Sequence, residues 1–159
     1  MTPPMTPAAL VEDVFAAFAE YLTRQPVTTL RAGNALDDHR PPPPFDAVLD
    51  KVCDACLEQF SWGVSFLDPA SWRHDPPYLI DHAVRQVSAG GYAVETMFAS
   101  LRPPDRDPPR LATLNDEQEK AIAAALEMLA FSDESAHQES ACQVLEEWWI
   151  PGAHYRSQP

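Results

Sequence analysis

The stretch NDEQEKAIAAALEMLA, residues 115–130, shows most clearly which kind of fold this chain adopts. Asn115 followed three residues later by Gln118 is the pattern of a capping box, in which each side chain bonds the backbone amide of the other residue. The apolar residues that follow recur at the three- and four-residue spacing of a helix with one buried side: Ile122, Ala125, Leu126 and Leu129. The segment therefore predicts a capped amphipathic helix.

Apolar residues keep this helical spacing over much of the chain on both sides of that segment. It covers residues 7–24, 45–60, 75–87, 94–101 and 135–149. No run alternates apolar and polar residues as a half-buried strand would, and 5 glycines stand against 17 prolines, which disfavours a fold built on glycine turns. We therefore predict an all-α protein of five to six helices around one core, joined by proline-rich connectors.

The predicted boundaries are residues 7–150 for a single helical domain, and residues 1–6 and 151–159 for two tails. Within the domain, residues 25–44 form either a loop or a short helix. Thr29 can cap such a helix, whereas the run from Pro41 to Pro44 favours an extended chain. Both alternatives stay open from the sequence.

Between residues 65 and 79 the chain reads SFLDPASWRHDPPYL. The Ser-Phe-Leu-Asp-Pro run, followed by Trp72-Arg73 and a helix with prolines, resembles the central motif of a small bacterial family that is catalogued only as a domain of unknown function. Further matching segments are the N-terminal helix with Phe15 and Phe18, Leu30–Ala32, Ala35–Asp38 and Leu114–Gln118. His74-Asp75-Pro76 departs from the family's aromatic and aliphatic residues. The resemblance implies a helical fold and a bacterial source, and it implies no activity and no functional residue.

The net charge of −13 limits the partners that this chain can bind. Nucleic acid and anionic membrane surfaces would repel it, so we expect neither as a partner. No run of about 18 apolar residues is present that could span a membrane, and the N-terminus lacks the pattern of a signal peptide. Three cysteines are too few for a disulfide framework. These features predict a cytoplasmic protein.

Cys53 and Cys56 form a CxxC pair, a spacing that occurs in zinc sites and in redox proteins. A structural zinc site needs four ligands, and no second close pair is present because Cys142 stands alone. A redox pair is expected at the start of a helix, whereas this pair falls inside the helix predicted over residues 45–60. We therefore expect these cysteines to pack in the core, and we predict no metal and no cofactor.

The densest polar cluster of the sequence contains His74, Asp81, His82 and Arg85. A His and a carboxylate that meet in a cleft can act as base and acid, so an alternative function is a small enzyme or metal-binding protein that uses this cluster. Asp81 and Arg85, however, have the spacing of an ordinary ion pair on a helix surface. Asp75 is expected to cap the helix that begins at Pro76. We assign no catalytic residue.

Acidic residues gather towards the C-terminal end of the chain. Between Asp116 and Glu147 nine carboxylates accompany one base, Lys120, which accounts for −8 of the net charge of −13. Such a surface attracts a basic protein, and Trp is common at the centre of interfaces. The predicted partner-binding residues are Asp133, Glu134, Glu139, Glu146, Glu147, Trp148 and Trp149.

Trp148 and Trp149 are neighbours on a predicted helix, so their side chains point about 100° apart and cannot both enter the same core. Either one of them anchors an interface, or the chain from Ile150 to Tyr155 folds over it. We predict a non-catalytic protein that binds a basic protein partner, as an immunity protein does when it neutralises a cationic bacterial toxin. The sequence leaves the oligomeric state open.

Overall fold

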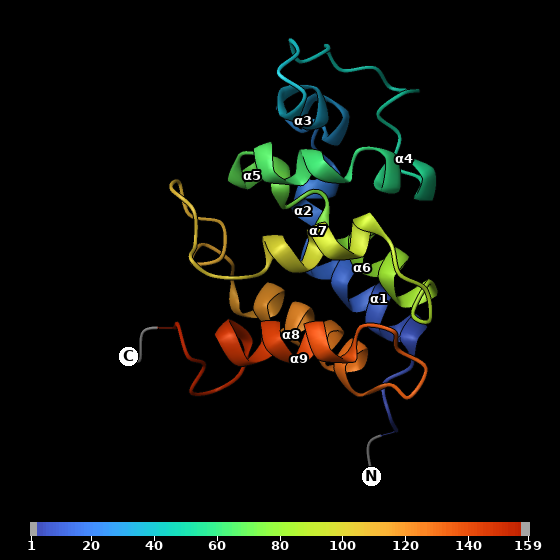
Figure 1. The fold of residues 1–159 in the computed structure, drawn as a ribbon, viewed down its shortest axis with the longest axis vertical. Coiled ribbons are helices and arrows are strands. Elements are labelled where there is room, and N and C mark those ends of the chain that lie inside the picture. Colours follow the sequence, from blue (N-terminus) through green and yellow to red (C-terminus); the bar gives the residue numbers. More distant parts are fainter. Residues whose placement is uncertain (1–2, 157–159) are drawn as a thin grey trace.

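Every regular element among residues 3–156, which the computed structural model describes, is a helix (Figure 1). Those of seven residues or more are α1 (Pro7–Ala17), α3 (Leu30–Asp37), α6 (Pro76–Arg85), α7 (Tyr92–Ser100), α8 (Asp116–Phe131) and α9 (Gln138–Val144). The shorter ones are α2 (Ala19–Leu22), α4 (Asp54–Gln59), α5 (Pro69–Trp72), the 3-10 helix η1 (Ser61–Phe66) and the π-helix η2 (Leu145–Trp149). The predicted all-α fold is confirmed. The outermost parts of the two predicted tails, residues 1–2 and 157–159, lie outside the described residues.

Side-chain caps explain why several helices begin where they do. Thr6 and Thr29 each accept a hydrogen bond of 3.1 Å from the amide three residues further on. Asn115 and Gln118 form the predicted capping box, with both reciprocal hydrogen bonds present. Each cap stabilises its helix by about 1 kcal/mol. The helix predicted after Asn115 and the short helix after Thr29 are confirmed, and the first predicted helix is interrupted at Phe18.

The helix predicted over residues 45–60 is wrong in its first half. Residues 47–50 form a turn, and only α4 is helical. The Asp46 carboxylate accepts hydrogen bonds of 2.9 Å from the amides of Val48 and Leu49, and the Asp50 carboxylate accepts one of 2.8 Å from the Asp46 amide. Side-chain hydrogen bonds of this local kind compete with the backbone pattern of a helix. The apolar side chains of the stretch consequently lie exposed: Phe45, Val48 and Leu49.

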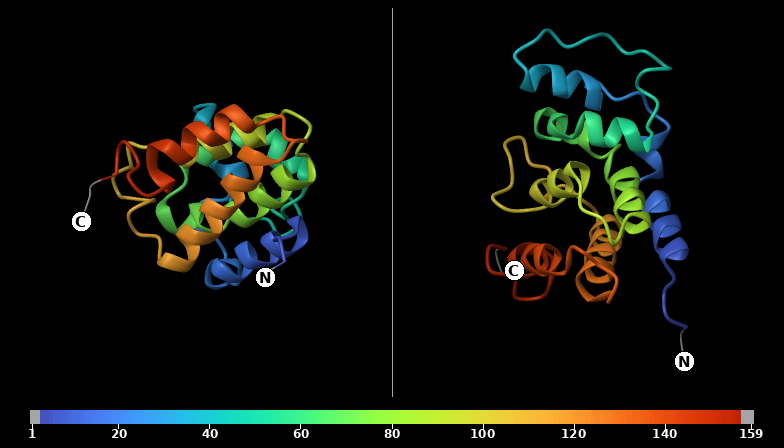
Figure 2. Two further views of the ribbon diagram at one scale, coloured as in Figure 1. Left: turned by 90° about the horizontal axis from the view of Figure 1, so that it is seen from below. Right: turned by 45° about the vertical axis from the view of Figure 1, so that its right-hand side comes forward.

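The helices are stacked from the α3 end of the molecule to the α9 end (Figure 1). Helices α1, α4, α5, α6, α7 and α8 contribute large, fully buried side chains to the core, among them Leu10, Leu57, Trp72, Leu79, Ile80, Met97, Ile122, Leu126 and Leu129. Helix α8 packs against both α1 and α9, and Figure 2 shows α1 and α9 on its two sides. The outward side of α9 is therefore left to solvent.

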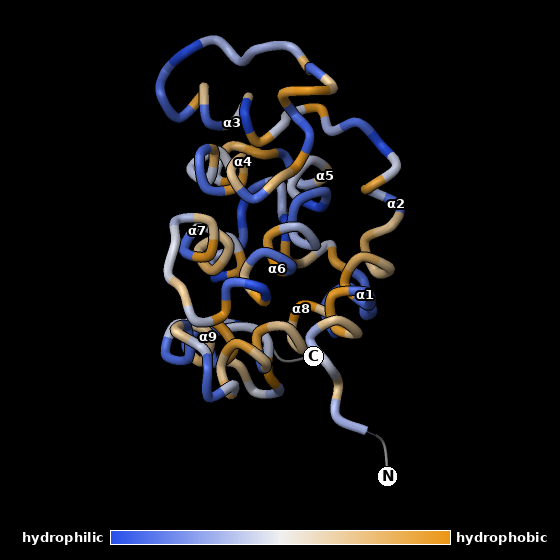
Figure 3. The backbone as a smooth tube through the Cα atoms, turned by 90° about the vertical axis from the view of Figure 1, so that its right-hand side faces the viewer, coloured by the Kyte–Doolittle hydropathy of each residue, from blue (hydrophilic) through white to orange (hydrophobic). Residues whose placement is uncertain are grey.

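The chain between α3 and α4 runs along the outer end of the molecule and is mostly hydrophilic (Figure 3). Arg31 of α3 fastens it. Its guanidinium donates two hydrogen bonds to the Asp50 carboxylate and one to the Pro44 carbonyl oxygen, each of 3.0 Å. The Asp50 side chain is 2% exposed, so this bidentate ion pair is shielded from water and holds the loop in place.

Candidate functional site

The predicted partner-binding residues divide into an exposed set and an inward-facing set. The exposed set consists of Asp133, Glu134, Glu139 and Glu146. None of these four carboxylates has an ion-pair partner within residues 3–156, and no Lys or Arg occurs between residues 121 and 155. Phe131, at the end of α8, is 70% exposed and close by in the chain. We call these five residues the acidic face.

Glu147 belongs to the inward-facing set. Its carboxylate accepts two hydrogen bonds from the Arg102 guanidinium, of 2.9 and 2.7 Å. These hydrogen bonds lower the pKa of the Glu147 carboxyl group because they favour its charged form. Arg102 follows the end of α7, so the pair joins α7 to η2 and leaves Glu147 no free charge for a partner.

Trp149 and Trp148 are both engaged within the protein. Trp149 is buried, and its indole N–H donates a hydrogen bond of 2.9 Å to a backbone carbonyl at the end of α7. Trp148 is half-buried, and the Arg156 guanidinium lies 5.2 Å from its ring centre. The Tyr155 amide donates to the Glu147 carbonyl oxygen at 3.1 Å. The chain after η2 therefore folds back over Trp148, which is the second of the two alternatives left open by the sequence.

The polar cluster predicted between His74 and Arg85 is divided by the fold into two places. His74 precedes α6 and faces a cavity with Asp75 beside it. Asp81, His82 and Arg85 lie further along α6. Both His82 and Arg85 reach towards α4. The four predicted residues consequently do not form one site.

The α6 part of the cluster connects three helices. The His82 ring lies 3.0 Å from the Asp54 carboxylate and 2.9 Å from the Glu58 carboxylate. Arg85 donates two hydrogen bonds to Asp54, and these, followed by the one from His82, lower the pKa of the Asp54 carboxyl group. Glu58 also accepts a hydrogen bond of 3.0 Å from the Tyr92 amide, so it caps α7. We conclude that this group stabilises the packing of α4, α6 and α7.

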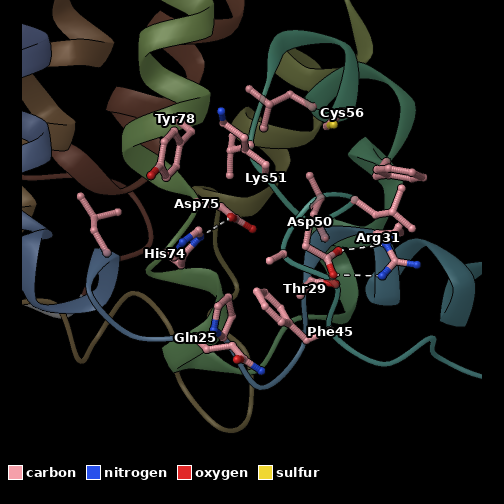
Figure 4. Close-up of a pocket in the computed structure, with 18 of the residues that line it drawn as sticks. Gln25, Thr29, Arg31, Phe45, Asp50, Lys51, Cys56, His74, Asp75 and Tyr78 are labelled. Atoms are coloured by element: carbon pink, nitrogen blue, oxygen red, sulfur yellow. Dashed lines mark hydrogen bonds and ion pairs between the residues drawn. The ribbon is translucent and has the colours of Figure 1, made fainter.

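A cavity of about 410 Å³ lies between the chain that precedes α4 and the start of α6 (Figure 4). That volume is within the usual range for small-ligand pockets. Its apolar wall is formed by Leu22, Leu30, Phe45, Leu49, Val52 and Leu57. Polar side chains also line it: Gln25, Thr29, Lys51, His74, Asp75 and Tyr78. The mixture suits a small molecule with an apolar body and a polar group.

Asp75 orients His74 at this cavity. The two side chains meet at 3.0 Å between Nδ1 and Oδ1, and the His74 ring packs against Tyr78 with ring centres 5.5 Å apart. The predicted cap is wrong, because the Asp75 carboxylate binds His74 instead of an amide of α6. Burial raises the pKa of the Asp75 carboxyl group. Because Nδ1 of His74 meets Asp75, Nε2 is the ring nitrogen left for another partner.

Two further observations concern metal ligands and membrane-spanning helices. No group of three or more His, Cys, Asp or Glu side chains in the described part of the chain is arranged to hold a metal ion. None of the helices within those same residues is long and apolar enough to cross a membrane.

Comparison with known proteins identifies a family. The family model of DUF6714, described as a family of unknown function, matches residues 7–153. The chain belongs to this family. No curated protein and no solved structure matches it. The resemblance drawn from the Ser-Phe-Leu-Asp-Pro motif to a family of unknown function is therefore confirmed.

Sequence analysis missed two features of this DUF6714 chain. The cavity combines Lys51 and Tyr78 with the residues around the Arg31–Asp50 pair, and these segments come together only through the fold. Cys53 is exposed at the start of α4, so the expectation that it packs in the core is wrong. The aspartates at residues 46 and 50, which favour turns, were the signal that the helix starts late.

Proposed function

We propose that this protein binds a basic protein partner through its acidic face and catalyses no reaction there. The observation that carries the proposal is the exposure of Asp133, Glu134, Glu139 and Glu146, without an ion-pair partner for any of them in residues 3–156. Glu139 and Glu146 are seven residues apart, close to two helical turns, so they project on the same side of α9 and η2. The face thus offers several carboxylates at once.

The composition of the acidic face favours a protein as the partner. Phe131 presents an apolar side chain that is 70% exposed next to the carboxylates, and a protein partner can bury it. The surrounding negative charge speeds the approach of a basic partner and discourages acidic ones. A cationic bacterial toxin has the required chemistry, in which case the protein would act as an immunity protein.

Affinity capture from cells of the source organism tests this proposal. We expect the tagged protein to retain a basic protein at about 0.1 M salt and to release it at about 1 M, because the Debye length falls from about 10 Å to about 3 Å. The captured protein is identified by mass spectrometry and its charge computed from its sequence. If no basic protein is retained at the lower salt concentration, the proposal fails.

The cavity supports a second candidate function, an enzyme that acts on a small molecule. His74 lies 3.0 Å from a buried carboxylate in a cavity of about 410 Å³, an arrangement in which an imidazole can serve as a general base. A panel of hydrolase substrates tests it. We expect turnover by the wild type and by the His154→Ala control, whose histidine is exposed, and a loss of about 10²-fold or more in His74→Ala. Absence of turnover by the wild type, or equal rates for both variants, contradicts this function.

A further inference from the structure

Cys53 and Cys56 form a pair of thiols whose positions are set by the fold. Cys53 has an extended backbone (φ −149°, ψ 164°) and is the N-cap of α4, where its Sγ accepts a hydrogen bond of 3.3 Å from the Cys56 amide. The two Sγ atoms lie 2.7 Å apart, and both residues are free thiols. The sulfur atoms of a disulfide are about 2.05 Å apart, so a small side-chain rotation suffices to join them.

The two thiols differ in their access to solvent. Cys53 is exposed, whereas Cys56 is half-buried and lines the cavity (Figure 4). The hydrogen bond between the two thiols, aided by that from the Cys56 amide, lowers the pKa of Cys53. The same thiol contact, together with burial, raises the pKa of Cys56. Cys53 is therefore the more reactive and more accessible nucleophile, and Cys56 is the less accessible second thiol of the pair.

We propose that Cys53 and Cys56 are a thiol–disulfide exchange site whose substrate is a small-molecule disulfide. An exposed thiol with a second thiol within bonding reach is what such an exchange requires. Cys56 lines the cavity and Cys53 does not, so a small disulfide reaches the pair from solvent at the exposed Cys53. The site lies at the α4 end of the molecule, away from α9, and it is independent of the proposed binding of a basic protein (Figure 1).

The exchange takes place in two steps, and in each step one S–S bond forms and another breaks. In the first, the Cys53 thiolate attacks one sulfur of the substrate disulfide, the S–S bond of the substrate breaks, and one thiolate leaves, which takes up a proton from water. In the second, Cys56 loses its proton to water, attacks Cys53 Sγ and expels the other half of the substrate as a thiolate. The protein dithiol is oxidised by two electrons to a disulfide, and the substrate is reduced to two thiols.

Cys142 provides an internal reference on the same chain. It is a free thiol on α9, half-buried and packed against the core, at the opposite end of the molecule from α4 (Figure 1). Its reaction with a small disulfide reports how readily a thiol of this protein reacts without a neighbouring thiol. Replacing Cys142 with Ser leaves Cys53 and Cys56 as the two thiols of the chain that can react.

The experiment treats the fully reduced protein with oxidised glutathione, stops the reaction with acid, and measures intact mass and released glutathione. For the wild type and for Cys142→Ser, we expect an internal disulfide between Cys53 and Cys56 and two glutathione molecules released per chain. Cys56→Ser should stop at a single glutathione adduct on Cys53. In Cys53→Ser the remaining thiol of the pair, Cys56, is half-buried, so it should form its glutathione adduct roughly tenfold more slowly, or slower still, than Cys53 does in Cys56→Ser. Peptide mapping locates each bond.

Three results would overturn the proposal. The first is a wild type that accumulates glutathione adducts without an internal disulfide. The second is an adduct on Cys142 that forms as fast as the one on Cys53. The third is an adduct on Cys56 in Cys53→Ser that forms as fast as the adduct on Cys53 in Cys56→Ser. Circular dichroism of each reduced variant checks whether its helices are intact, which separates a loss of exchange from unfolding.

Discussion

At Gly33, helix α3 passes so close to η1 that a side chain has no room. A Cβ there would lie 2.5 Å from the Gly63 carbonyl oxygen, a backbone atom that cannot rotate away. A Cβ at Gly63 would in turn meet the Leu30 carbonyl oxygen. The two glycines are thus required by close packing of backbones, which holds α3 over the cavity.

Gly33→Ala should consequently destabilise the protein by about 1–3 kcal/mol, because one methyl group overpacks this crossing. Urea unfolding followed by circular dichroism measures the change in the free energy of unfolding. Gly90→Ala is the matched control, since a Cβ at Gly90 meets nothing within 4 Å, and it should be within about 0.5 kcal/mol of the wild type. Equal effects of the two substitutions would show that the α3–η1 contact is looser than described.

Single residues also explain why the helix over residues 45–60 and the position of Cys53 were predicted wrongly from the sequence. The spacing of Phe45, Val48 and Val52 matches a helix, but the Asp46 and Asp50 carboxylates bind nearby amides and hold turns instead. The spacing of apolar residues carries no information about this competition between side-chain and helical hydrogen bonds. The same spacing predicted that Cys53 lies inside a helix, so the exposure of its thiol at the start of α4 was not predicted.

At the scale of elements, the helix that begins with a capping box was predicted well and the contacts that connect the helices were not. The capping box before α8 is local in sequence, so its residues are visible without the fold. The Arg102–Glu147 pair, by contrast, joins residues 45 positions apart, and nothing in the sequence marks it. That pair fastens the end of α7 to η2 and removes Glu147 from the outer surface of the C-terminal helices.

The Arg102–Glu147 pair makes the stability of this contact depend on pH. The pKa of Glu147 in the folded protein lies below its usual value of 4.5, so the stabilisation is present above about pH 4.5 and is lost as the pH falls through the lowered pKa. Arg102 is 42% exposed, so solvent screening limits the contribution of the ion pair to the free energy of unfolding to about 1 kcal/mol. Glu147→Gln should be less stable than the wild type at pH 7, and the difference should shrink in acid.

Urea unfolding at neutral pH and below about pH 4 measures that difference. Glu146→Gln serves as the control, because Glu146 is exposed and has no ion-pair partner among residues 3–156, and it should change stability by less than about 0.5 kcal/mol at either pH. A difference for Glu147→Gln that stays constant with pH would contradict the role given to its charge.

At the scale of the whole molecule, the net charge of −13 and its bias towards the C-terminal helices follow directly from the sequence. Which carboxylates face solvent does not, because exposure depends on long-range packing. The structure leaves Asp133, Glu134, Glu139 and Glu146 outside and draws Glu147 and both C-terminal tryptophans inward. The proposed interface is therefore smaller than the sequence suggested, and its charge is concentrated on the outward side of α9 and the turn before it.

The most direct test compares two double variants that have the same net charge but carry the change on different faces of the molecule. Glu139→Lys with Glu146→Lys alters the acidic face, whereas Glu12→Lys with Asp13→Lys alters exposed residues of α1, on the other side of α8 (Figure 2). Each substitution adds two charges, so each double variant changes the net charge from −13 to −9. In affinity capture at about 0.1 M salt, the account predicts that the wild type and the α1 variant retain the basic partner and the acidic-face variant does not. Equal retention by both double variants would contradict it.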